Sequence, residues 1–250
     1  MRRRRPIRPR PRRTLSLVAL TPNFLTILGL CAGLTAIRFA LVDRWEIAAA
    51  LIIFAAVIDG LDGLLARKLD AASPFGAELD SLSDFVSFGV APAVLVYSAL
   101  LSGLGDAGWA FALVFAICCC LRLARFNVAR AVPEAPTRTH FTGVPAPAGA
   151  MLGLLPLFLT LGGVVPADRA PWGVALWLAL VGALMVSRLP TLSPKALRIP
   201  RERAPWAMVG LALAVGVGFT RFWLLMILAC LVYVATLGYA ALQRGRIPRE

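Results

Sequence analysis

Apolar stretches long enough to cross a lipid bilayer dominate this chain and leave few folds open to it. Eight such segments can be drawn, at 22–42, 45–66, 78–102, 107–130, 145–164, 171–188, 205–219 and 222–242. A helix needs roughly 20 apolar residues to cross about 30 Å of hydrocarbon, and backbone groups in lipid have to bond within their own segment. The sequence therefore predicts an all-α polytopic membrane protein with eight spans, of which 205–219 is the shortest.

The distribution of basic residues predicts how these spans are oriented. The formal net charge is +13, which alone would be compatible with a nucleic-acid partner. If the N-terminus lies in the cytoplasm, however, all but four of the 26 Lys and Arg residues fall on cytoplasmic segments, the exceptions being Arg38, Arg44, Arg169 and Arg221. Cytoplasmic loops of membrane proteins carry such an excess. We therefore expect both termini in the cytoplasm, a basic head that is attracted to anionic lipid, and no nucleic-acid partner.

Four aspartates lie inside the apolar segments, where ionised groups are costly. Asp59 and Asp62 lie near the cytoplasmic end of the second segment, and Asp80 and Asp84 near the cytoplasmic start of the third. An Asp at a helix centre costs about 2.5–3.5 kcal/mol on insertion scales. The spacings i, i+3 and i, i+4 put each pair on one helix face, and a short connection makes the two helices antiparallel neighbours. Four converging carboxylates without His or Cys predict a site for two divalent cations, Mg²⁺ or Mn²⁺.

Two other interpretations of these carboxylates use the same residues. A packing and salt-bridge cluster would need Arg67 and Lys68 as counterions, but two basic groups at the edge do not balance four acids. An ion or proton pathway stays open at this point, because transporters also bury aspartates. The five cysteines all lie in apolar segments, with no CxxC pair, and are expected to pack as small apolar residues.

The residues around the aspartates form a longer pattern that resembles a known family. Residues 59–84 fit D-x2-D-G-x2-A-R-x8-G-x3-D-x3-D at every fixed position, which is similar to the signature of CDP-alcohol phosphotransferases. The segment TPNFLTILGL resembles the first span of this family. Three further segments, RLARFNV, FTGVPAPAGA and MVSRLPTLSPK, resemble integral-membrane bacterial phosphatidylserine synthases.

The resemblance implies a fold and a division of the chain. A six-helix catalytic core would occupy 21–195, after a basic cytoplasmic head at 1–20 and before a two-span extension and basic tail at 196–250. It also implies a homodimer in the bacterial plasma membrane, with the active site on the cytoplasmic side.

The resemblance further assigns roles to individual residues. Asp59, Asp62 and Asp80 match metal ligands, and Asp84 matches a residue that contacts the second metal and accepts the proton of the attacking hydroxyl. The positions that match contacts to the CDP-lipid are Asn23, Thr26, Gly63, Arg67, Ser73 and Gly76.

The implied reaction transfers the phosphatidyl group of CDP-diacylglycerol to L-serine and releases CMP. A zwitterionic acceptor needs a cation for its carboxylate, and the RLARFN segment makes Arg122, Arg125 and Asn127 the candidates. Glycerol 3-phosphate or an inositol phosphate are the alternative acceptors within the family. A transporter that uses the four aspartates is a remote alternative, since it has no need for Gly76 or Arg67 at these spacings.

Overall fold

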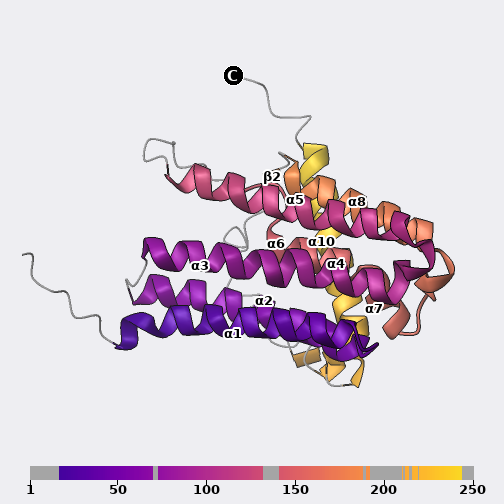
Figure 1. The fold of residues 1–250 in the computed structure, drawn as a ribbon, viewed down its shortest axis with the longest axis horizontal. Helices are drawn as coiled ribbons and strands as arrows, with labels where there is room; N and C mark the ends of the chain where they lie inside the picture. The colour runs from indigo at the N-terminus through magenta and orange to yellow at the C-terminus, as the bar shows by residue number, and fades with distance from the viewer. Residues whose placement is uncertain are drawn as a thin grey trace, which may run out of the picture.

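The computed structural model describes residues 17–69, 73–131, 141–187, 190–191, 210, 212–213, 216–218 and 220–243. The helices α1 (Leu17–Ala40), α2 (Trp45–Lys68), α5 (Asp106–Ala131) and α8 (Pro171–Val186) run side by side with a long helix that begins at α3 (Pro74–Asp84), as Figure 1 shows. Five helices in the described part of the chain are long and apolar enough to cross a membrane, and 171–186 forms a shorter apolar one. The protein is thus an all-α polytopic membrane protein. Most residues of the predicted seventh span, 205–219, lie outside the described residues, as does the head up to residue 16.

The long helix that begins at α3 changes its winding directly after Asp84. It continues through the π-helical segment η1 (Phe85–Val90), then α4 (Ala91–Val96), a second π-helical segment η2 (Tyr97–Leu101) and the 3-10 turn η3 (Ser102–Leu104). The Ala91 amide donates to the Val86 carbonyl, five residues back. Pro92 follows directly, and because a proline has no amide hydrogen and its ring crowds the carbonyl four residues earlier, the helix widens before it. π-helical turns of this kind are often found at functional sites.

Small and hydroxyl residues hold α1 against α3 and η1. The hydroxyl of Ser83 donates to the Thr26 carbonyl and that of Ser87 to the Gly29 carbonyl, each at 3.2 Å. At Gly33, an added Cβ would lie 2.9 Å from the Cα of Ser87, closer than side chains tolerate. Small residues permit such approaches between membrane helices. The spacing between α1 and η1 is therefore set by residues that leave no room for a larger side chain.

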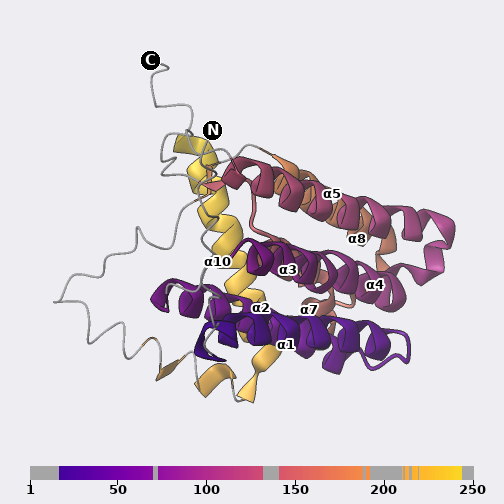
Figure 2. The same ribbon diagram turned by 60° about the vertical axis from the view of Figure 1, so that its left-hand side comes forward.

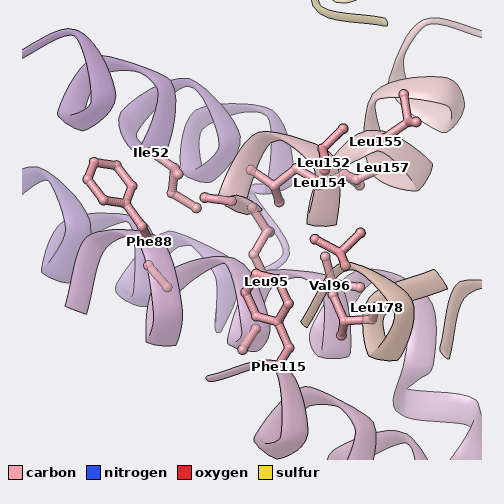
Figure 3. Packing of buried hydrophobic residues seen from close by; sticks show 14 of the residues in the cluster. Ile52, Phe88, Leu95, Val96, Phe115, Leu152, Leu154, Leu155, Leu157 and Leu178 are labelled. Carbon is pink, nitrogen blue, oxygen red and sulfur yellow. The ribbon is translucent and has the colours of Figure 1, made fainter. Parts of the chain in front are cut away.

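The predicted single span 145–164 is wrong in detail, because it forms two helices. These are α6 (Ala146–Gly153) and α7 (Leu155–Leu161), which meet at Leu154. Pro156 cannot donate to the Leu152 carbonyl, and the indole nitrogen of Trp177 on α8 donates to that oxygen instead, at 2.7 Å. Apolar side chains from α2, η1 and α4 to α8 fill the centre between these helices, and Figure 3 shows Ile52, Phe88, Leu95, Phe115 and Leu178 among them.

A short pairing of extended segments joins the loops at one end of the bundle. Strand β1 (Phe141–Thr142), which precedes α6, pairs antiparallel with β2 (Pro190–Thr191), which follows α8. The side chain of Arg125 on α5 reaches the same place and donates to the Val186 carbonyl at 2.8 Å. The three segments that resemble bacterial synthases downstream of the aspartates thus come together in space. We call this end of the bundle, where α2 ends and α3 begins, the site end.

The last helix, α10 (Phe222–Gln243), packs differently from the others. It crosses the long helices at a steep angle in both views (Figures 1 and 2). Near its start, the Trp223 ring stacks on Phe158 of α7 with 5.8 Å between centroids. Further along, the Cys230 thiol contacts the Met151 carbonyl of α6 at 3.5 Å. These contacts anchor α10 to α6 and α7 rather than to α1 and α2. The loop segment η4 (Ala167–Arg169) links α7 to α8.

Candidate active site

The four aspartates come together between α2 and the long helix, as their spacing predicts. Asp59 and Asp62 lie on α2, and Asp80 and Asp84 on α3. One carboxylate oxygen from each of Asp59, Asp62 and Asp80 lies within 4.8 Å of the other two. All four aspartates line one water-sized cavity of about 10 Å³. This geometry is suited to a metal site, in which Asp84 lies beside the other three carboxylates.

Helix α1 orients one of these carboxylates. The hydroxyl of Thr26 donates to Oδ2 of Asp62 at 2.8 Å and also approaches the Pro22 carbonyl at 3.1 Å. Asp62 and Thr26 are both buried. Hydrogen bonds from such neighbouring groups fix the orientation of metal-binding side chains. Thr26 therefore couples the position of α1 to that of the metal-site carboxylates.

A larger cavity of about 160 Å³ adjoins the aspartates and opens toward the site end. It shares Thr26, Asp62 and Asp80 with the smaller cavity among the aspartates, and its remaining walls come from α1, α2 and the start of α3. All six residues predicted to contact the CDP-lipid line this single cavity: Asn23, Thr26, Gly63, Arg67, Ser73 and Gly76. The structure thus brings together residues that are up to 53 positions apart in the sequence, from Asn23 to Gly76.

The start of α3 forms the floor of this cavity through a helix cap. Ser73 precedes the helix, Pro74 occupies its first position, and the Gly76 amide donates to the Ser73 hydroxyl at 3.0 Å. A Cβ added at Gly76 would lie 2.9 Å from Oδ1 of Asn23. Glycine at this position lets the Asn23 amide group of α1 lie directly against the first turn of α3.

The three acceptor candidates on α5 lie in different surroundings. Asn127 accepts a hydrogen bond from the Ser81 hydroxyl at 3.0 Å, which ties α5 to α3 between Asp80 and Asp84. Arg125 is exposed and donates to the end of α8, as described above. Arg122 is partly buried, stacks its guanidinium 5.9 Å from the Phe126 ring centroid, and interacts electrostatically with Asp84 and Asp59.

A tyrosine that the sequence analysis did not single out lies near Arg122. Tyr233 of α10 interacts electrostatically with Arg122. Among the described residues, the side-chain polar atoms that are buried without a hydrogen-bond partner are Trp45 Nε1, Arg122 Nε and the Tyr233 hydroxyl. No sequence signal pointed to Tyr233, because it lies in an apolar span far from any motif.

Similarity to known proteins decides the family. The family model described as CDP-alcohol phosphatidyltransferase matches residues 19–186. The chain belongs to this family. The matched region runs from α1 to the end of α8. It therefore includes the four clustered aspartates and all the residues that line the 160 Å³ cavity.

Several curated relatives of this CDP-alcohol phosphatidyltransferase carry the same name. Proteins of Mycobacterium tuberculosis and Mycobacterium leprae, both called CDP-diacylglycerol–serine O-phosphatidyltransferase, are 40% identical over 237 residues. The match spans 93% of this chain in both cases, and 82% and 78% of the relatives. A Bacillus subtilis protein with the same name is 40% identical over 147 residues, which is 56% of this chain and 80% of that protein.

The carboxylate oxygens of the aspartates are suitable ligands for the divalent metal on which this family depends. The convergent ligand atoms are carboxylate oxygens, without His or Cys among the described residues that cluster there. Hard oxygen ligands of this kind suit Mg²⁺, Mn²⁺ or Ca²⁺ rather than softer ions. Arg122 interacts electrostatically with Asp59 and Asp84, and Arg67 lines the adjoining cavity beside Asp62 and Asp80, but two basic side chains carry less charge than four carboxylates. The site therefore needs metal charge to hold all four aspartates ionised.

Proposed function

We propose that this protein transfers the phosphatidyl group of CDP-diacylglycerol to the hydroxyl of L-serine, giving phosphatidylserine and CMP. The observation that carries the proposal is the 40% identity, over 93% of the chain, to proteins named for this activity. The site described above supplies what the reaction needs, namely a carboxylate cluster beside a cavity at one end of a membrane bundle.

The donor would bind with its nucleotide in the 160 Å³ cavity and its acyl chains in the bilayer. Arg67 lines that cavity, and its guanidinium can pair with phosphate oxygens. Two divalent cations, Mg²⁺ or Mn²⁺, held by Asp59, Asp62, Asp80 and Asp84, would neutralise the pyrophosphate and the charge on departing CMP. Gly63 leaves its part of the cavity wall without a side chain, so that the nucleotide can lie close to the backbone there.

Asp84 is the proposed general base. A hydroxyl is a poor nucleophile near neutral pH, and a carboxylate in hydrogen-bond reach can take its proton as the new bond forms. The serine oxygen would bond to the phosphorus that carries the diacylglycerol, and its proton would pass to Asp84. The bond from that phosphorus to the bridging oxygen would break, and CMP would leave with the electron pair.

Among the three candidates on α5, Arg122 has the surroundings best suited to binding the serine carboxylate. It is partly buried and interacts with Asp84, so an acceptor between them would present its hydroxyl to one and its carboxylate to the other. Arg125 and Asn127 remain predicted contacts of the acceptor. Both already take part in hydrogen bonds between helices, Arg125 with the Val186 carbonyl and Asn127 with the Ser81 hydroxyl.

The distribution of charge supports a proposed location and topology. The protein would lie in the plasma membrane of a bacterium with both termini and the site end on the cytoplasmic side, where CMP and serine are soluble. We also propose a homodimer with a catalytic unit at 21–195 and a basic head at 1–20, followed by the extension 196–250.

An acceptor panel tests the reaction. Purified protein is given CDP-diacylglycerol with Mg²⁺ or Mn²⁺, and CMP release is measured with serine, glycerol 3-phosphate or an inositol phosphate. Serine is expected to increase CMP release, and removal of the metal with a chelator to abolish it. CMP release that increases with a phosphorylated acceptor but not with serine would refute serine as the acceptor. Ion flux in liposomes without CDP-lipid would favour the transporter alternative.

A further inference from the structure

One face of α10 is turned toward the rest of the protein. Ile227 and Cys230 are buried on it, and Tyr233 follows three residues later as a partly buried residue packed against the core. The contacts of Trp223 with Phe158 and of Cys230 with Met151 fix this face along α7 and α6. The position of Tyr233 is therefore set by packing on the same face of its own helix.

Two buried polar groups, one on α5 and one on α10, are near enough to interact electrostatically but bond neither to each other nor to any described residue. The Tyr233 hydroxyl and the Arg122 Nε are both buried, both lack a hydrogen-bond partner within the described ranges, and interact only electrostatically. A buried polar group left unpaired costs about 1–3 kcal/mol. Two such groups near one another indicate a binding site, in which a ligand would supply the missing hydrogen bonds.

The chemistry of the two groups defines that ligand. Arg122 Nε can only donate a hydrogen bond, and the tyrosine hydroxyl can donate one as well. Two donors, one of them on a cation, favour an anionic oxygen ligand such as a carboxylate. Because Arg122 also interacts with Asp84, such a ligand would lie next to the proposed general base.

We propose that Tyr233 is a specificity-determining residue whose hydroxyl, together with Arg122, binds the carboxylate of the acceptor amino acid. This inference rests on the proposed function, because it takes serine as the acceptor. The hydroxyl and the carboxylate of serine are separated by only two carbons, which suits an acceptor held between Asp84 and the Arg122–Tyr233 pair.

The proposal gives the last helix a function that the family core lacks. Tyr233 lies outside the matched region 19–186, whereas the aspartates and the nucleotide cavity lie within it. Residues of α1, α2 and α3 would then bind the CDP-lipid donor. The choice of acceptor would depend partly on α10, a helix that follows the family core. A change of acceptor would require no change in the metal site.

The test compares serine with serinol, in which a hydroxymethyl group replaces the carboxylate. Tyr233→Phe removes only the hydroxyl. It is expected to raise the KM for serine about tenfold, since a hydrogen bond to a charged group is worth about that factor. The KM for CDP-diacylglycerol and the kcat at saturating serine should change little. The preference for serine over serinol, measured as a ratio of kcat/KM values, should fall by the same factor.

Tyr239→Phe is the matched control, since Tyr239 lies on the same helix and is 60% exposed. It should keep the wild-type KM for serine and the wild-type preference. The preference is a ratio, so it can be measured even if part of the Tyr233→Phe protein is misfolded.

Each other outcome refutes a specific statement. If the wild-type protein uses serine and Tyr233→Phe keeps the wild-type serine KM and preference, Tyr233 does not bind the acceptor. If Tyr233→Phe raises the KM values of serine and CDP-diacylglycerol equally and lowers the melting temperature, the hydroxyl has a structural role only. If the wild-type protein releases no CMP with serine, the proposed function itself is wrong, and the acceptor role of Tyr233 fails with it.

Discussion

At the scale of single residues, the four aspartates differ in position and in proposed role: all four would hold metal, and Asp84 would also accept the proton of the attacking hydroxyl. Asp59, Asp62 and Asp80 converge within 4.8 Å, while Asp84 lies where α3 passes into the π-helical segment η1. Thr26 reaches the group from a different helix and bonds to Asp62. Substitutions at these positions should therefore have different kinetic effects, although all of them lie in one small volume.

Asp84→Asn is expected to lower kcat by about 10²- to 10⁴-fold, the usual contribution of a general base. The other three aspartates remain, so the variant should still bind CDP-diacylglycerol with an affinity near that of the wild type. Turnover is measured as CMP release, and donor binding by competition with a labelled nucleotide. Asp43→Asn is the control, because Asp43 is exposed at the opposite end and its φ of 58° suits asparagine as well as aspartate. A wild-type kcat in Asp84→Asn would exclude Asp84 as the base.

Thr26→Val keeps the size of the side chain but removes the donor to Asp62. Loss of such an orienting hydrogen bond typically costs 10- to 100-fold in metal affinity or activity. We expect the Mg²⁺ or Mn²⁺ concentration for half-maximal activity to rise by about that range, whereas Thr26→Ser should keep a value close to that of the wild type. An unchanged metal requirement in the valine variant would show that Asp62 needs no support from α1.

At the scale of elements, the long helix from α3 to η3 shows what the sequence could and could not predict. The i, i+4 spacing of Asp80 and Asp84 predicted a shared face, and the short link after α2 predicted an antiparallel pair. The π-helical turns after Asp84 were not predicted, although Pro92 could have indicated them. The break at Leu154 was also missed, because Pro156 was not considered and the Leu152 carbonyl, to which Pro156 cannot donate, accepts a hydrogen bond from Trp177 on another helix.

Gly33→Ala tests the close contact between α1 and η1. The added Cβ would lie 2.9 Å from the Cα of Ser87, so the helices must move apart. Overpacking of this kind costs about 1–3 kcal/mol, and the melting temperature in detergent should fall by several degrees. Gly238→Ala is the control, since a Cβ at that exposed position of α10 meets no atom within 4 Å. A melting temperature that falls equally in both variants would contradict the role given to the contact.

At the scale of the whole molecule, the aspartate cluster, the 160 Å³ cavity and the paired strands lie at the site end. Segments from residue 23 to residue 191 contribute to that end. The family signature indicated the aspartates together with Gly63, Arg67 and Gly76, because it lies within two helices and the link between them, whereas Asn23 and Thr26 came from the first-span segment. The steep crossing of α10 and the position of Tyr233 could not be predicted, because they depend on tertiary packing against α6 and α7 that no local pattern encodes.

Cysteine labelling tests the proposed sidedness. In a variant whose five native cysteines are replaced by alanine, one cysteine is introduced at Lys68 on the site end or at Ser102 on the opposite end. Both side chains are exposed. In intact cells, a maleimide that cannot cross the inner membrane should label the Ser102→Cys protein, and the Lys68→Cys protein only after the membrane is permeabilised. The reverse pattern would place the active site on the outer face.

The pairing of β1 with β2 has a consequence for the order in which this protein assembles. It joins residues on the order of 50 positions apart, with α6, α7 and α8 between them, and closing such a loop costs entropy that local contacts do not. The ribosome completes β2 only after all three helices have been made. The loops at the site end therefore acquire their mutual contacts late, when the aspartates of α2 and α3 have long been synthesised. An early chain would hold the aspartate cluster before it holds the loops that β1 and β2 join.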